Sequence, residues 1–577
     1  MKRLFFFALL LVLVPGLLPL FGQADRATIL GTVTDSSGAV LPGVEISAVN
    51  VATGVKTPGL TNEVGNYVLV NLPIGTYKVS FALPGFKTTE RSDFGVTTGQ
   101  KARLDVVLQV GEVTEMVTIS ANSELIQTDS PLVSTTMQAD VINDLPLSFD
   151  GGRAVENFAY RVSPGVEGDN WTSYLSGGQA FSKEVLIDGV SATAQIQGHI
   201  GESSPTMEAV QEFKVQTSGM SAEYGRTSGG VFNFALKSGT NDFGGSLFYY
   251  GRNEALNANT WMNNWSRAKY NGDEDDYKRA RDRQSLGGVS AGGPVVIPGL
   301  YNGRDKTFIF GAFEHYWRET YYLGAMDQTV PIPEFLDGNF SALLTNNKVG
   351  TDPLGRDVFA GQIYDPATLQ KVGGKWVAEP FPGNIIPANR ISAVSKKITD
   401  VFRQGYLPMV PGRLTNNNAL TATNNPWFHQ TQFTGKADHN LSDTHKLSGS
   451  FIWTQRPRIL VDQGGIWNPD DPNGWGGPLA KSRKQEVTSR RLVVSDNLTF
   501  RPTLINTLTL AFNRYRNPSE STQNLDNAKN WSEELGLGNT AMSNFPEINF
   551  GDAVNGIGTT GVGYNSGSGF YVGNTYI

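Results

Sequence analysis

Three groups of residues have types and spacings that can support chemistry. His199 and Glu202 form a His-x-x-Glu arrangement that suits zinc, and His315 lies downstream as a candidate third ligand. The run from Asp273 to Asp276 supplies carboxylates, the ligands that Ca²⁺ prefers. The stretch from Gly556 to Gly561 matches the G-x-G-x-x-G letters of a dinucleotide-binding turn.

None of these groups is accompanied by the elements that would position it. Zinc ligands need further hydrogen bonds to orient them, but His199 and Glu202 lie in a Gly- and Ser-rich stretch and His315 in an aromatic strand-like run. No helical pattern follows the glycine motif, and an acidic run in an irregular segment is more often simply solvated. We therefore expect no enzyme, cofactor or bound metal, and a zinc carboxypeptidase-like enzyme is the least favoured alternative.

The composition favours strands joined by turns. The chain has 577 residues with 65 glycines and 10% aromatic residues, and long amphipathic helical patterns are scarce. Acidic residues outnumber basic ones, 54 to 47, so the charge balance does not indicate nucleic-acid binding. Cysteine is absent, which excludes disulfides and thiolate chemistry and suits a protein of the cell envelope.

Residues 1–24 have the pattern of a secretory signal peptide. Lys2 and Arg3 precede an apolar run, prolines interrupt it, and small residues around Ala24 suit cleavage there. A membrane anchor is the alternative, but the run falls short of the roughly 20 apolar residues that span a bilayer. No later stretch has the pattern of a membrane-spanning helix, so a membrane-spanning mature chain would cross as a β-barrel.

The segment 25–110 has the pattern of a small β-sandwich. Short β-branched runs are separated by glycine and proline turns, and Val33, Tyr67, Tyr77 and Val79 are predicted core residues. With turns such as Leu41-Pro-Gly43, the segment resembles the carboxypeptidase-regulatory-like (transthyretin-like) domain over nearly its whole length. That resemblance implies a folded spacer or docking module without chemistry of its own.

From residue 241 onward the pattern indicates a membrane wall. Between His445 and Gln455, apolar and polar residues alternate, with Ile452 as the exception on the polar face. The runs 492–500 and 507–513 alternate in the same way, which is typical of outer-membrane barrel strands. Short turns separate some runs and long polar segments separate others, as expected of the two ends of a barrel. Trp residues in these segments suit either membrane interfaces or a sugar-stacking surface.

The region before this wall carries a second set of motifs. The run Glu184–Val190 (EVLIDGV) predicts a strand ending in an Asp-Gly hairpin, and residues 222–226 (AEYGR) precede the apolar run Val231–Leu236. Together these stretches resemble the plug and barrel start of a TonB-dependent outer-membrane receptor of the Oar-like group. The resemblance implies structural roles in the plug for Asp188, Gly189, Tyr224, Gly225 and Arg226, with Arg226 in an ion pair between plug and barrel.

A short extended segment after the sandwich resembles a TonB box. Its residues are Glu115, Met116, Val117, Thr118, Ile119, Ser120 and Ala121. Extended segments in linkers can pair with the sheet edge of another protein. The competing interpretation, a last strand of the sandwich, stays open.

We therefore predict a mainly β protein: a transmembrane antiparallel β-barrel, present in part, with an N-terminal plug and a preceding sandwich. The expected divisions are a signal peptide at 1–24, a sandwich at 25–110, a linker at 111–124, a plug at 125–240 and the first part of the barrel at 241–577. Eight to ten candidate strands precede Ile577. The resemblance implies a barrel of 22 strands, so we expect an incomplete chain; the alternative is a complete small barrel, which would leave little room for a plug.

The resemblance also implies the location and the partners. We expect an outer-membrane receptor that works with the inner-membrane TonB complex, contacts outer-membrane lipid and imports an extracellular ligand, either a siderophore, a carbohydrate or a peptide. Nucleic acid is not an expected partner. The alternative from another class is a surface structural or adhesion protein on the same barrel.

Overall fold

The computed structural model describes part of the chain. The described residues are 26–112, 116–120, 132–144, 156–168, 173–180, 182–193, 204–220, 224–225, 227–271, 274, 278–321, 329–410, 412–414, 418–419, 428–461, 478–479, 482–501, 504–521, 529–538, 545–546 and 569–576.

The N-terminal unit is a two-sheet sandwich. Its strands are β1 (Ala27–Asp35), β2 (Glu45–Asn50), β3 (Lys56–Leu60), β4 (Asn66–Leu72), β5 (Gly75–Ala82), β6 (Thr88–Val96), β7 (Lys101–Arg103), β8 (Val106–Leu108) and β9 (Met116–Ser120). One sheet joins β4, β1, β7 and β8, and the other has the order β3-β2-β5-β6-β9. The four predicted core residues are at most 2% exposed. The predicted sandwich and its core are therefore confirmed.

The central unit follows the N-terminal unit in the chain. Its elements are β10 (Val133–Gln138), α2 (Ala139–Asp144), α3 (Glu156–Val162), β11 (Val166–Gly168), β12 (Ser173–Leu175), β13 (Lys183–Ile187), β14 (Val190–Ser191), η1 (Met207–Ala209), β15 (Val210–Ser218) and β16 (Gly230–Leu236). Five strands form a sheet in the order β10-β15-β16-β13-β14. The apolar run at 231–236 lies in β16, which is buried along its whole length between β15 and β13.

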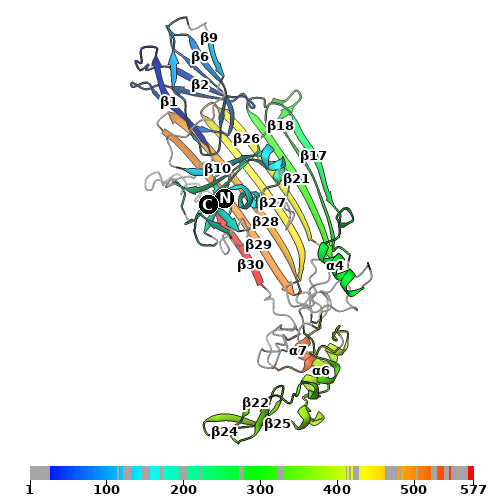
Figure 1. Ribbon diagram of the computed structural model, residues 1–577. Helices are drawn as coiled ribbons and strands as arrows, with labels where there is room; N and C mark the ends of the chain where they lie inside the picture. The colour runs from blue at the N-terminus through cyan, green and yellow to red at the C-terminus, as the bar shows by residue number, and fades with distance from the viewer. Residues whose placement is uncertain are drawn as a thin grey trace, which may run out of the picture.

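The wall is one eight-stranded antiparallel sheet. Its strands are β17 (Gly244–Arg252), β18 (Arg281–Pro294), β21 (Thr307–Tyr321), β26 (Phe428–Ser442), β27 (His445–Val461), β28 (Ser482–Arg501), β29 (Leu504–Ser521) and β30 (Gly569–Tyr576). They pair in chain order. Figure 1 shows the sheet curving, with the central unit against its concave side.

The faces of the wall alternate as the sequence predicts. Leu492 and Val494 on β28, and Leu508 and Leu510 on β29, are 45 to 61% exposed. Their neighbour Val493 is 3% exposed and turns inward. Ile452, the exception in the pattern, is 1% exposed and packs into the hydrophobic core of the central unit. The side chain that breaks the alternation is thus a contact between the wall and the unit it surrounds.

The connections between wall strands differ at the two ends. At one end, only two residues separate β26 from β27, and the β18–β21 connection is a turn with the small hairpin β19 (Val296–Ile297) and β20 (Tyr301–Asn302). The N-terminal unit lies at this end, and long excursions leave the opposite end (Figure 1). Long and short connections therefore segregate as predicted.

The long excursions carry structure of their own. The first has η2 (Glu254–Leu256) and α4 (Trp261–Tyr270). The others hold α5 (Pro333–Leu336), η3 (Ser341–Leu343), β22 (Lys348–Thr351), β23 (Asp357–Phe359), β24 (Tyr364–Val372), β25 (Lys375–Pro380), η4 (Pro382–Asn384), η5 (Ala388–Arg390), α6 (Ala393–Arg403) and α7 (Trp531–Leu535). We call this second set, with its described flanking residues, the loop unit. Its core joins residues from three excursions, including Phe402, Leu479 and Leu535.

Within the described parts of the chain, the longest apolar helices are too short or too polar to cross a membrane.

Candidate functional site

The most constrained contact between the units is built on the turn between β13 and β14. Ile187 pairs with Val190, so Asp188 and Gly189 form a two-residue hairpin loop. Their φ angles are 48° and 74°, as a type I′ turn requires, and Asp and Gly tolerate such angles best. The hairpin expected at Asp188-Gly189 is therefore present, and its tip points to the wall.

Arg491 of β28 binds the backbone of this hairpin. Its Nη1 donates to the carbonyl of Ser191 at 2.7 Å, and its Nη2 donates to those of Val190 at 2.7 Å and Ile187 at 3.2 Å. The Arg491 residue is 1% exposed. A buried guanidinium needs acceptors on several sides, and the hairpin supplies three backbone carbonyls.

Lys436 of β26 binds the same turn from a second strand. Its Nζ lies 3.2 Å from Asp188 Oδ1 and 3.2 Å from the carbonyl of Leu236. Asp188 Oδ1 also accepts from the backbone N–H of Leu236 at 3.0 Å. Asp188 therefore joins β14, β16 and the wall at one point. We call Asp188, Lys436 and Arg491 the hairpin latch.

The sequence indicated only one of the three latch residues. Asp188 was expected as a structural residue, together with its neighbour Gly189, but Arg491 and Lys436 were not identified. A signal existed for Arg491, since it lies two residues before Val493 on the inward face of an alternating strand. In the same register Arg491 stands opposite Ile452, so the apolar exception on β27 and this buried arginine on β28 mark the same patch.

The other predicted plug residues lie elsewhere. Tyr224 is half-buried, and its hydroxyl lies near the Gly99 turn of the N-terminal unit. Gly225 is exposed, and a Cβ there would meet nothing within 4 Å, so close packing does not require glycine at this position. The close approach falls instead at Gly230, where a Cβ would lie 2.5 Å from the Gln216 carbonyl. Arg226 and its predicted ion pair lie outside the described residues.

A second contact attaches the central unit to the N-terminal unit. Glu212 and Lys214 are two residues apart on β15, so their side chains lie on the same face. Glu212 Oε1 accepts from the backbone N–H of Thr98 at 2.7 Å, and Lys214 Nζ donates to the Thr98 carbonyl at 2.8 Å. Both backbone groups of one residue are therefore held by a pair of opposite charges. We call these three residues the Thr98 clamp.

The clamp charges are buried. Glu212 is 2% exposed, Lys214 1% and Thr98 0%. Burial raises the pKa of the Glu212 carboxyl, although the Thr98 N–H and Lys214 act in the opposite direction. Burial likewise lowers the pKa of Lys214, against the attraction of Glu212. The desolvation of each charge is thus only partly offset by its partners, which makes the clamp sensitive to the loss of either one.

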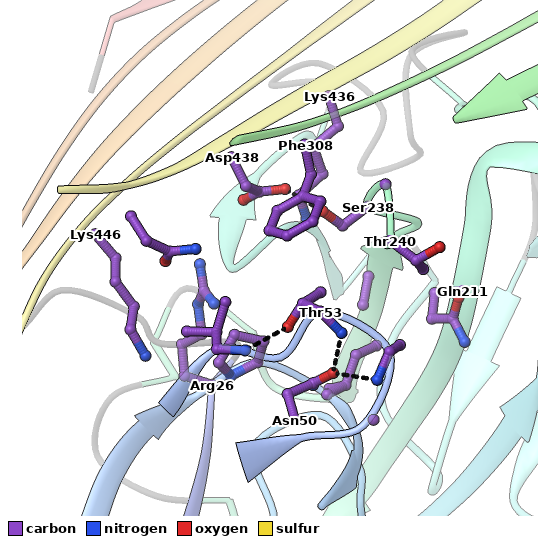
Figure 2. A pocket seen from close by; sticks show the side chains of 18 of the residues that line it. Arg26, Asn50, Thr53, Gln211, Ser238, Thr240, Phe308, Lys436, Asp438 and Lys446 are labelled. Carbon is purple, nitrogen blue, oxygen red and sulfur yellow. Dashed lines mark hydrogen bonds between the residues drawn. The ribbon is translucent and has the colours of Figure 1, made fainter. Parts of the chain in front are cut away.

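The N-terminal unit also touches the wall. The carbonyl of Ala52 accepts from the backbone N–H of Asn241 at 2.9 Å, and Lys446 Nζ donates to Thr57 Oγ1 at 3.1 Å. A cavity of about 180 Å³ lies between these contacts. Figure 2 shows Asn50 and Thr53 of the N-terminal unit on one side of this cavity and Lys446 and Asp438 of the wall on the other.

The predicted TonB-box segment contributes an edge strand to the sandwich. Residues Met116–Ser120 form β9, which pairs in parallel with Thr88–Ser92 of β6. Glu115 and Ala121 lie outside the described residues. Residues 116–120 therefore form the last strand of the sandwich, as the competing interpretation predicts, and the interaction of this segment with a TonB protein stays a prediction.

The candidate metal and nucleotide motifs gain no support from the described residues. His199, Glu202 and the glycine motif lie outside them, as do three of the four residues of the acidic run. Glu274, the described member of that run, lies 3.4 Å from Arg267. His315 Nδ1 lies 3.0 Å from Thr431 Oγ1. Among described residues, no group of three or more His, Asp or Glu side chains is arranged to hold a metal.

Two family matches cover most of the chain. Residues 235–576 match the family described as an outer membrane beta barrel domain. Residues 28–109 match the carboxypeptidase regulatory-like domain. The first match spans the wall and its excursions, and the second spans the sandwich.

The curated relative matches a smaller part of the chain than the two families together. The TonB-dependent transporter Oar of Myxococcus xanthus is 27% identical over 308 residues, which make up 50% of this chain and 27% of that protein. The chain thus spans about a quarter of the length of this curated relative. These matches confirm the resemblances to the regulatory-like domain and to Oar-like transporters.

Solved structures of receptors are also similar. The outer membrane transporter YddB from Escherichia coli has a TM-score of 0.37 at 12% identity, covering 67% of this chain and 39% of that one. A ferric enterobactin receptor, PfeA from Pseudomonas aeruginosa, has a TM-score of 0.37 at 12% identity, covering 77% of this chain and 45% of that one.

Proposed function

The chain belongs to the outer membrane beta-barrel domain family, and from this premise we propose that it is part of a TonB-dependent receptor that imports a scarce or large substrate. The protein resides in the outer membrane. In this proposal the wall is the first part of the barrel, the central unit is the plug and the N-terminal unit faces the periplasm. No bond is made or broken in the substrate.

The observation that carries the proposal is the hairpin latch. A surface or adhesion barrel has no need of a folded unit inside it, whereas a gated transporter needs a plug held firmly enough to block the bore. Arg491 and Lys436 hold the hairpin through hydrogen bonds and one ion pair, with no covalent link. In this proposal such a contact holds the plug in place at rest, and it can be broken and remade because none of its bonds is covalent.

The Thr98 clamp supplies a route by which a pull from the periplasm reaches the plug. β9 pairs with β6, and β6 ends at Val96, two residues before Thr98. Thr98 is held by Glu212 and Lys214 of β15, and β15 pairs with β16, whose Leu236 bonds to Asp188. A load on segment 115–121 would therefore pass through the sandwich to the strand beside the latch.

The test uses the natural absence of cysteine. Val117→Cys gives the 577-residue chain one thiol, at the predicted box, and the partner is a TonB periplasmic domain carrying one engineered cysteine. We expect a disulfide-linked adduct at Val117 and none from Thr76→Cys, an exposed position on the same unit. Equal adducts from both positions, or none from either, would contradict the coupling proposal.

The long loops favour one alternative, a surface adhesion protein on the same barrel. The loop unit has a hydrophobic core of its own, which a transporter loop does not require. Val117→Pro separates the two functions, because proline removes an N–H needed for strand pairing. Energised uptake should be lost while any cell-surface adhesion stays unchanged.

A further inference from the structure

The loop unit contains a cavity that the proposed coupling does not use. It has a volume of about 430 Å³ and lies between α5, α6 and the segments beside them. Its walls include Val330, Phe335, Leu336, Ile398 and Phe402. Phe335 stacks on Phe340 with ring centroids 5.0 Å apart, which fixes one wall.

The deepest part of the lining consists of buried side chains. Val330 is 0% exposed, Phe402 2%, Leu336 6% and Phe335 7%. The half-buried Phe340, Ile398 and Leu414 also line the cavity, so they are the apolar side chains that a molecule entering it can contact. The volume falls within the range of pockets that enclose small ligands.

The chemistry of the lining is uniform. Among the described lining residues none carries a charge, and the polar side chains are the hydroxyls of Thr329, Ser395 and Thr399. Thr399 already donates to the carbonyl of Lys396 at 2.9 Å within α6. An anionic chelate would find no cation here, and an oligosaccharide would find few hydrogen-bond partners for its many hydroxyls.

We propose that this cavity is a binding site for a neutral, mainly apolar small molecule, such as an aromatic ring system or a short acyl chain. Transfer of apolar surface from water into such a cavity is favourable. Its place in a substrate pathway rests on the proposed receptor function, since the loop unit lies at the wall end opposite the N-terminal unit (Figure 1). Binding itself does not depend on that function.

The test is photolabelling of the full chain, folded in an amphipol, with trifluoromethylphenyl diazirine, a small neutral apolar probe. Labelled peptides are mapped by mass spectrometry. We expect saturable labelling of residues 329–340 and 393–403. The lipid-facing strands β28 and β29 will also be labelled, without saturation, and serve as an internal measure of nonspecific partition.

The decisive variant is Thr399→Phe, which places a ring in the cavity. Labelling of the two cavity peptides should fall roughly tenfold, because a packed interior has no room for the probe, while labelling of β28 and β29 stays the same. Lys396→Phe adds the same ring at an exposed position of α6 and should change nothing. Leu414→Phe fills the cavity from another segment if the first variant fails to fold.

Two results would overturn the proposal: non-saturable labelling of the cavity peptides, or equal labelling in Thr399→Phe, Leu414→Phe and the parent chain. Neither requires TonB or an energised membrane. A failed labelling result with an intact Val117 cross-link rejects the cavity alone, and the reverse pattern rejects the coupling alone.

Discussion

The central unit is attached at two places, the hairpin latch and the Thr98 clamp, and the two attachments use different arrangements of charge. At the hairpin latch, two cations of the wall bind carbonyls and one carboxylate. At the Thr98 clamp, a carboxylate and an ammonium of the central unit bind the two backbone groups of one residue. The latch thus places an excess of positive charge in the interior, whereas the clamp is a neutral pair.

This difference indicates which attachment separates first when the N-terminal unit is pulled. The latch joins the central unit to strands held on both sides by long ladders of hydrogen bonds. The clamp joins it to a sandwich that has its own complete core. Separation at the clamp leaves both units folded, while separation at the latch exposes a buried arginine and the core contact of Ile452. We infer that the clamp opens at lower load.

The largest effect is expected from Arg491→Met, which keeps the length of the side chain and removes its donors. Three buried carbonyls lose their partner, at about 1–2 kcal/mol each, so the hairpin should loosen by roughly 3–6 kcal/mol. Hydrogen exchange of the 183–193 amides measures this directly. Arg490→Met changes the exposed neighbour on the same strand and should leave the exchange unchanged. Unaltered exchange of these amides in Arg491→Met would show that Arg491 does not stabilise the hairpin.

The second-largest effect is expected at the Thr98 clamp, where a double variant should be less damaging than either single variant. Glu212→Met or Lys214→Met alone leaves one buried charge without its partner and should weaken docking by about 3 kcal/mol. The double variant removes both desolvation costs and should dock better than either single variant. At the latch no such compensation exists, because Arg491 is paired mainly with backbone carbonyls that cannot be deleted.

Docking is measured by energy transfer between two introduced cysteines, at the exposed residues Ser37 of the N-terminal unit and Arg304 of the wall. The chain lacks native cysteine, so the labels are specific. A double variant that docks worse than both single variants would show that the charge pair is net stabilising, so that the clamp would not be the weaker of the two attachments.

The two attachments also differ in how far the sequence predicts them. Asp188-Gly189 was identifiable because a two-residue hairpin needs positive φ angles that few residues accept. The wall was identifiable because alternation has a fixed period, and Ile452 was visible as a break in it. Glu212, Lys214 and Lys436 gave no comparable signal, since their partners are more than 100 residues away and two of the contacts are to backbone.

A smaller effect tests the local geometry of the latch. Gly189→Ala places a Cβ at a φ of 74°, which costs about 1–2 kcal/mol for an L-residue. Exchange at the 183–193 amides should increase accordingly, though less than in Arg491→Met. Gly225→Ala is the matched control, because a Cβ there meets nothing and should have no effect. Equal effects at the two glycines would mean that the hairpin turn is not specially constrained.

The smallest effect is expected at the contact between the N-terminal unit and the wall. Thr57→Val keeps the shape of the side chain and removes the acceptor of Lys446, so docking should weaken by about 0.5–1.5 kcal/mol. Thr76→Val, at an exposed position of the same unit, should leave the energy-transfer signal unchanged. Because the Thr98 clamp is intact in both variants, the N-terminal unit should remain docked. Complete undocking in Thr57→Val would mean that the wall contact, and not the clamp, holds the N-terminal unit, and that a pull on β9 bypasses β15.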